Sequence, residues 1–222
     1  MTVKKALNEI EAIVVRTTTN LLGFVSEVGR PGSELRLACG DLRANVNTYL
    51  RDGTFGRRFM ICFRLSTDAG ITIDWMDVVL RQLTNEKPTE LMALTVVQSA
   101  ILFALAQNGR ILRKTVFTSR EDCEAMLRRM KDWVDIVKDL AGNEMDDMSW
   151  RALNELGGAM TRYLADVARP LPRMLNYEIV PSPALTIAQY IYGDGERHEE
   201  LAAENKVVHP AFMPRRIKAL SA

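Results

Sequence analysis

Few residues in this chain have the types and spacing that catalysis needs. Its two histidines are His198 and His209. His198 stands beside Glu199 and Glu200 in a helical pattern, which favours an exposed polar face, and a ring that shapes a turn is the simpler interpretation of His209 before Pro210. A general base would need an oriented partner and a cleft, and the sequence offers neither as a separate constellation. We therefore expect no catalytic residues and no enzyme.

Metal and cofactor motifs are also missing from the sequence. The three cysteines, Cys39, Cys62 and Cys123, are far apart and odd in number, and no Cys-x-x-Cys pair occurs. Each has apolar neighbours, which predicts small buried hydrophobes rather than zinc ligands or disulfides. Asp146 and Asp147 are adjacent and cannot face each other on a helix, so a helix start suits them better. No glycine-rich phosphate loop or nucleophile elbow appears, and we expect no cofactor and no metal.

Composition excludes several classes of partner. The 222 residues are 47% hydrophobic and 26% charged, as in an ordinary globular protein with a sizeable core. The 29 basic and 28 acidic residues leave a net charge of +1, which argues against nucleic-acid binding through bulk electrostatics. The amino terminus has no secretory pattern. Residues 91–106 are uncharged but too short and too interrupted for a bilayer span, so we expect a buried core helix and no membrane partner.

Helical periodicity runs through most of the first 172 residues. Helices are expected over residues 3–28, 33–50, 67–83 and 91–106. The segment 29–32, with two glycines and a proline, is expected to stop the first helix, and Ser33 to cap the second. Residues 55–65 fit either a strand or a helix, because Phe59, Ile61, Phe63 and Leu65 alternate; we favour a helix.

Two longer stripes follow, over residues 123–140 and 150–167. Thr118 and Glu121 are spaced as a capping box at the start of the first. A short polar turn joins the stripes, which predicts an antiparallel helical hairpin. Trp133 and Trp150 flank the turn and are candidates either for interface anchors or for packing on one another.

The pattern changes after Pro172. Residues 177–180 and 216–220 read as short strands, and helical stripes at 187–192 and 198–205 lie between them, separated by the turn at Gly193. The expected fold class is mainly α: a helical domain with the long hairpin over residues 1–172, then a small α+β module of order β-α-α-β over residues 173–222.

The terminal module resembles the LysM module, a strand–helix–helix–strand unit with a Tyr-Gly-Asp turn. The matching residues are Ile187, Ala188, Tyr192, Gly193, Asp194, Leu201 and Asn205. In sugar-binding LysM modules the loop after the first strand supplies backbone donors to an acetamido sugar. Here that loop contains Pro181 and Pro183, which lack an N–H, so we expect the module to dock onto protein rather than sugar.

A longer resemblance covers residues 119–222. The run YGDGERHEELAAENKVVHPAFMP is similar to the carboxyl end of the tail-baseplate family of Mu-like phages, often labelled DNA-circularisation proteins. A Ser-Arg helix start at Ser119 and a Leu-Pro-Arg step at Leu171 precede it in the same order. The amino-terminal domain that gives many relatives the circularisation label has no trace here, so a DNA-joining role is not implied.

The resemblance implies a structural protein of a contractile phage tail. It would be a baseplate hub or adaptor that acts through protein–protein contacts in a ring of like copies, with other baseplate, tail-tube or hub proteins as partners, and it would be located in the virion. The alternative is a LysM-type module that binds peptidoglycan. The candidate signature or interface residues are Tyr192, Gly193, Asp194, Asn205, His209, Pro210, Phe212, Trp133 and Trp150.

Overall fold

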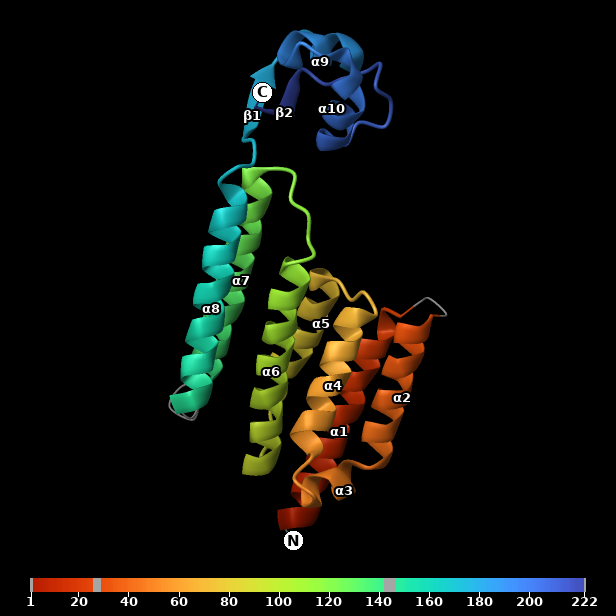
Figure 1. Cartoon of the computed structure of the whole chain (residues 1–222), viewed down its shortest axis with the longest axis vertical. Helices are drawn as coiled ribbons and strands as arrows, with labels where there is room; N and C mark the ends of the chain where they lie inside the picture. Colours follow the sequence, from red (N-terminus) through yellow and green to blue (C-terminus); the bar gives the residue numbers. More distant parts are fainter. Residues whose placement is uncertain (1, 26–28, 142–146, 222) are drawn as a thin grey trace. The chain divides into compact units, whose positions relative to one another are not determined.

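The computed structural model describes residues 2–25, 29–141 and 147–221, and for residues 2, 3 and 141 only the backbone (Figure 1). The chain is mainly helical, as the sequence predicts. Its first helices are α1 (Thr2–Gly23), α2 (Arg30–Ala44), α3 (Val46–Arg51), α4 (Phe55–Asp68), α5 (Ile73–Thr84) and α6 (Leu91–Leu112). The later elements are α7 (Arg120–Ala141), α8 (Asp147–Ala168), β1 (Met174–Glu178), α9 (Ala184–Tyr192), the 3-10 helix η1 (Gly195–Arg197), α10 (His198–Glu204) and β2 (Arg216–Leu220). Asp147 opens α8 as expected, and Asp146 lies outside the described residues.

The chain divides into two compact units. The first comprises residues 1–115 and 133–157, and the second comprises residues 116–132 and 158–222. These units are defined by where contacts within the chain are dense. The predicted boundary between residues 172 and 173 separates a helical domain from an α+β module. That is a different criterion, so the boundary stays a prediction.

Aromatic packing between α4 and α6 lies at the centre of the first unit. Phe59 and Phe63 are fully buried one turn apart on α4, and their ring centroids lie 6.5 and 6.1 Å from that of Phe103 on α6. Cys62 is buried beside them. This spacing of three and four residues places the apolar side chains on one helical face, so the helix favoured for residues 55–65 is confirmed.

Several predicted helix boundaries in this unit are wrong. The first helix ends at Gly23 rather than at residue 28. The helix predicted over residues 33–50 is divided at Asn45 into α2 and α3, and Gly29 rather than Ser33 is the N-cap of α2. The helix α2 already begins at Arg30, because Pro31 fits the first turn, where its missing N–H leaves no hydrogen bond unmade. The helix α5 begins only at Ile73, after its cap Thr72. The helix α6 continues to Leu112, because tertiary packing buries Asn108 and the residues around it.

One helix in the described part of the chain, α6, is long and apolar enough to cross a membrane by length and composition. Half of its most apolar window, 50%, is buried in the structure. Burial on this scale is what the sequence predicts for a core helix.

The helices α7 and α8 form the predicted antiparallel hairpin. The Arg120 N–H donates to the Pro172 carbonyl at 2.9 Å, so the start of α7 lies by the end of α8. Further along, a Cβ on Gly157 would come within 3.3 Å of Val134 Cγ1. The predicted capping box is wrong by one residue, because Ser119 Oγ accepts the Asp122 N–H at 3.2 Å.

The terminal module has the predicted order of strand, helix, helix and strand. The strands β1 and β2 pair antiparallel, from Met174 opposite Leu220 to Glu178 opposite Arg216. The strand β1 starts three residues earlier than predicted and ends at Glu178, ahead of Pro181. A small core lies between the sheet and the helices; it contains Ala184, Ile187, Ala188, Leu201, Met213, Ile217 and Ala219.

Candidate functional site: the terminal module

The Tyr-Gly-Asp turn is a double cap between two helices. Gly193 ends α9 with φ = 70°, a left-handed conformation that favours glycine. Asp194 Oδ1 accepts the Glu196 N–H at 2.9 Å and thereby caps η1. The Gln189 side chain spans the turn: its amide donates to the Gly193 carbonyl at 3.0 Å and accepts the Gly195 N–H at 3.1 Å. Gly193 and Asp194 therefore cap the helices on either side of the turn, and Gln189 bridges it.

Tyr192 joins the helices to the sheet. Its hydroxyl accepts the Leu220 N–H at 3.2 Å, and its ring lies 3.8 Å from the guanidinium carbon of Arg197. Arg197 in turn pairs with Glu200 at 2.6 Å, and this hydrogen bond raises the pKa of the guanidinium. Burial raises the pKa of the Tyr192 hydroxyl, so the neutral, hydrogen-bonding form is favoured.

Asn205 closes the outer edge of β2 at Lys218. Its amide donates to the Leu201 carbonyl at 2.8 Å and to the Lys218 carbonyl at 2.7 Å, and its Oδ1 accepts the Lys218 N–H at 2.7 Å. A single side chain thus satisfies both backbone groups of one strand residue. This is the pairing that a neighbouring strand would otherwise make.

His209 lies in the turn that follows α10, and its ring hydrogen-bonds locally. The sequence favoured a local carbonyl as its partner; instead its Nδ1 accepts the Ala211 N–H at 3.3 Å, and its own carbonyl accepts the Phe212 N–H at 3.0 Å. The His209 and Phe212 rings lie with centroids 5.4 Å apart, at an angle of 54°. The imidazole therefore has a structural partner on each side.

Two loops run side by side at this end of the module. One joins β1 to α9 and the other joins α10 to β2. They are tied at two points, where the Ile179 N–H donates to the Arg215 carbonyl at 2.8 Å and the Ala184 N–H donates to the Pro210 carbonyl at 2.7 Å. Residues 179–184 and 207–215 are called the loop pair.

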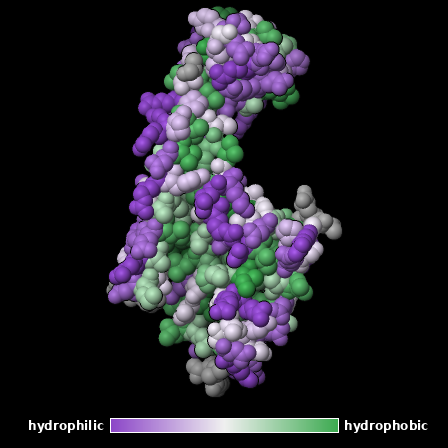
Figure 2. Space-filling view, in the orientation of Figure 1, coloured by the Kyte–Doolittle hydropathy of each residue, from purple (hydrophilic) through white to green (hydrophobic). Residues whose placement is uncertain are grey.

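The loop pair presents apolar side chains to solvent. Val180 is 81% exposed, Val208 is 99% exposed and Phe212 is 77% exposed, and these three side chains are called the loop face. These exposed apolar side chains stand on two loops that hydrogen bonds tie together, which makes them candidates for a contact surface. On the visible side of the module in Figure 2, hydrophilic residues predominate, with hydrophobic ones at its margins.

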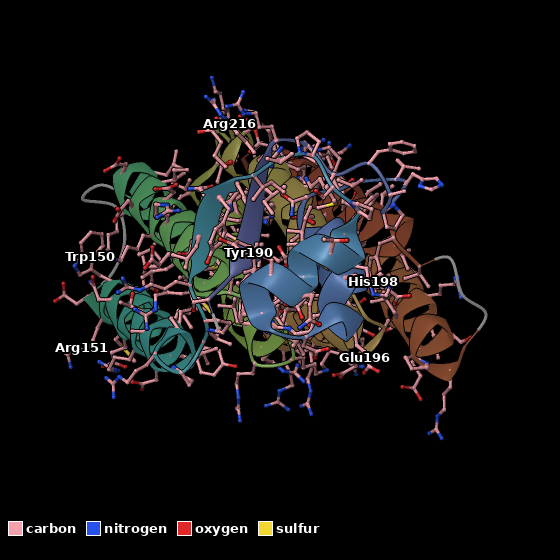
Figure 3. The ribbon with its side chains drawn as sticks, turned by 90° about the horizontal axis from the view of Figure 1, so that it is seen from above. Trp150, Arg151, Tyr190, Glu196, His198 and Arg216 are labelled. Carbon is pink, nitrogen blue, oxygen red and sulfur yellow. The ribbon has the colours of Figure 1, made fainter. Side chains whose placement is uncertain are left out.

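The outer surface of α9 adds a further exposed aromatic ring. Tyr190 is 84% exposed and points outward from α9 in Figure 3. His198, at the start of α10 in the same view, has Nδ1 at 3.0 Å from the Gly195 carbonyl, so it too is engaged in the turn.

The two tryptophans differ in exposure. Trp133 is 8% exposed and is a core residue, whereas Trp150 is 39% exposed, with the Lys138 ammonium 6.0 Å from its ring centroid. Of this pair, only Trp150 offers a ring to solvent in the structure.

A groove of about 590 Å³ crosses the outer face of the sheet. It is lined by Asn176, Tyr177, Glu178, Glu204, Asn205, Lys206, Arg216, Ile217 and Lys218. Burial and the nearby carboxylates of Asp122 and Glu200 raise the pKa of Glu204. No group of three or more metal-ligating side chains occurs among the described residues.

Comparison of the sequence with protein-family models gave no match, and neither did comparison with curated proteins. The sequence pointed to the turn, Asn205 and His209, but not to Gln189, which stands in no recognisable motif. Glu121 was expected in a capping box with Thr118; instead it accepts the Met174 N–H at 2.8 Å, from a residue 53 positions away in the sequence.

Proposed function

We propose that this chain is a structural component of a contractile phage tail, a baseplate hub or adaptor that acts through protein–protein contacts. The observation that carries the proposal is the loop face, formed by Val180, Val208 and Phe212. Two of its members, Val208 and Phe212, lie within residues 205–212, which read as the Asn-x-x-x-His-Pro-x-Phe signature of the phage family that the sequence resembles. Several copies around the tail axis would bring this surface against tube or hub proteins.

The hydrogen bonds of the loop pair favour a protein partner. The N–H groups of Ile179, Ala184 and Phe212 already donate to carbonyls within the module, and the Ser182 hydroxyl donates to the Val180 carbonyl at 3.1 Å. A sugar is recognised chiefly through its hydroxyl and acetamido groups, which need free donors and acceptors. The exposed apolar side chains of the loop face suit the core of a protein interface instead.

Peptidoglycan binding is the second candidate. The β-α-α-β order and the antiparallel pairing of the two strands support it, because they match the arrangement of a LysM module. Against it stand Pro181 and Pro183 in the loop where such a module offers its donors.

The deciding experiment uses the full chain and variants of the loop face. Phe212→Ser and Val208→Ser are compared with Leu37→Ser, which removes an equally exposed side chain (76%) from α2. Capture by purified tail-tube and hub proteins of the same phage is measured by biolayer interferometry. We expect each loop-face variant to weaken capture on the order of tenfold, as for a truncated interface anchor, and Leu37→Ser to leave it unchanged.

A parallel arm measures sedimentation with purified cell-wall sacculi. Saturable binding to sacculi that Phe212→Ser abolishes, without capture by any tail protein, would overturn the proposal and favour the LysM-type alternative. A phage that lacks this chain and still builds complete, infectious tails would overturn both the proposed location in the baseplate and the proposed role as hub or adaptor.

A further inference from the structure

The two outer edges of the β1–β2 sheet differ in how their backbone groups are used. In an antiparallel pair, alternate residues direct both backbone groups toward the partner strand or away from it. The Ser221 N–H donates to the Arg173 carbonyl at 2.7 Å, and the Ile179 N–H donates to the Arg215 carbonyl at 2.8 Å. Odd-numbered residues of β1 therefore pair with β2, and Met174, Asn176 and Glu178 direct their backbone groups outward.

On the β2 side the outer edge is closed at Lys218 and at the Leu220 N–H. Asn205 takes both backbone groups of Lys218, and the Tyr192 hydroxyl takes the Leu220 N–H. These contacts come from α9 and from the end of α10, which lie on the β2 side of the sheet in Figure 1.

On the β1 side the edge is closed only at its ends. The Met174 N–H donates to Glu121 Oε2 at 2.8 Å, and the Val180 carbonyl accepts the Ser182 hydroxyl at 3.1 Å. Between them, the N–H and C=O groups of Asn176 and Glu178 have no hydrogen-bond partner in the part of the chain that the structure describes. Open strand edges of this kind template pairing with another strand.

We propose that this edge pairs with β1 of a second copy of the chain, antiparallel and centred on Tyr177. In that register Asn176 lies opposite Glu178 of the second copy, and the two residues exchange both of their backbone hydrogen bonds. The twofold axis repeats the exchange, so the N–H and C=O groups of Asn176 and Glu178 are used in both copies. The result is a four-stranded antiparallel sheet of order β2–β1–β1–β2.

The side chains of β1 suit this register. Tyr177 meets Tyr177 of the second copy at a non-hydrogen-bonded position, where opposed side chains lie closest, and Leu175, 40% exposed, meets Ile179 of the second copy. Asn176 opposes a carboxylate that its amide can donate to.

The neighbouring registers are worse. Centring on Asn176 would require the Met174 N–H to leave Glu121, and centring on Glu178 would oppose two like charges. The free backbone groups and the side-chain pairing therefore select the same register.

This inference deepens the proposed function by naming a surface on which two copies meet, and it rests on that function only for its biological setting. Its test uses the purified full chain alone. Failure of the dimer and failure of tail-protein binding by the loop face can therefore be told apart, because each is measured in a separate experiment.

Sedimentation equilibrium across a concentration series tests the pairing. We expect the mass of the wild-type chain to rise from 25.0 kDa toward twice that value. Asn176→Glu places carboxylates opposite Glu178 twice across the twofold axis, and we expect dimerisation to weaken by at least about tenfold. The same change leaves the monomer folded, because Asn176 faces Lys218 within the sheet.

The double variant Asn176→Glu/Glu178→Lys puts opposite charges face to face, and we expect it to restore the dimer. Asn47→Glu, the same substitution on the exposed part of α3, is the matched control and should leave the dimer unchanged. Amide exchange should slow at Asn176 and Glu178 as concentration rises. A wild-type chain that stays monomeric, or a dimer that Asn176→Glu does not weaken, would overturn the proposal, as would failure of the folded double variant to recover.

Discussion

At the scale of single residues, Asn205 shows how a side chain can take the place of a strand. Its amide matches the N–H and C=O of Lys218 at 2.7 Å each and also binds the Leu201 carbonyl. The residue therefore holds α10 and β2 together through three hydrogen bonds. An asparagine suits this position because its side-chain amide carries both a donor and an acceptor.

Replacing Asn205 by Ala should destabilise the module. Three hydrogen bonds are lost, and each contributes about 0.5–1.5 kcal/mol net, so we expect a loss of about 1–3 kcal/mol at this partly exposed site. Chemical denaturation measures the loss, with Asn47→Ala as the control on exposed α3. Equal effects of the two substitutions would contradict the role assigned to Asn205.

Glu204 beside the groove should make stability depend on pH. Burial raises its pKa above the ordinary value of 4.5, so the folded state favours the protonated form. Its favourable contribution is therefore present below pH 4.5 and lost as the pH rises through the folded pKa. We expect Glu204→Gln to raise the melting temperature at neutral pH and to lose this advantage well below pH 4.5. Glu199→Gln, on the exposed face of the same helix, should show no such dependence.

At the scale of elements, the start of α7 is held by Ser119. Its hydroxyl accepts the Asp122 N–H at 3.2 Å and donates to Asp122 Oδ2 at 2.7 Å, so the two residues satisfy one another. Ser119 is fully buried, whereas Thr118 is exposed and its hydroxyl donates to the Asp122 carboxylate at 2.9 Å.

Ser119→Ala should therefore cost more than Thr118→Ala. Loss of a helix N-cap typically destabilises by about 1 kcal/mol, and the buried site places Ser119→Ala at or above that value. Urea denaturation followed by circular dichroism measures both variants. A larger loss for Thr118→Ala would restore the capping position that the sequence suggested.

How far the sequence predicted these elements depended on where the deciding contacts lie. Local periodicity was enough for α4, where Phe59 and Phe63 share a face, and for the α7–α8 hairpin. It failed at the end of α6, because Asn108 reads as a helix terminator although the fold buries it completely. The role of Asn205 could not be read from the signature, since its partner Lys218 is 13 residues away on a strand.

At the scale of the whole molecule, the two compact units should open independently. Cys39 and Cys62 are buried in the first unit and Cys123 is buried in the second, so each unit carries its own probe. The first two thiols share a hydrogen bond that lowers the pKa of Cys39 and raises the pKa of Cys62.

Pulsed thiol labelling over a urea series, read by peptide mass spectrometry, tests this independence. We expect Cys123 to become reactive at a different urea concentration from Cys39 and Cys62, because separate cores give separate opening free energies. One shared transition for all three cysteines would show instead that the units unfold as a single cooperative body.

The pairing of β1 with β2 also has a consequence for the order of events during synthesis. The chain emerges from the ribosome amino end first, so β1 is made well before its partner at residues 216–220. Until β2 is made, both edges of β1 are open and the floor of the small core, Ile217 and Ala219, is absent. The helices α9 and α10 therefore stay partly exposed until β2 has been made. A ribosome that stalls before Arg216 would present a nascent chain on which chaperones or proteases can act.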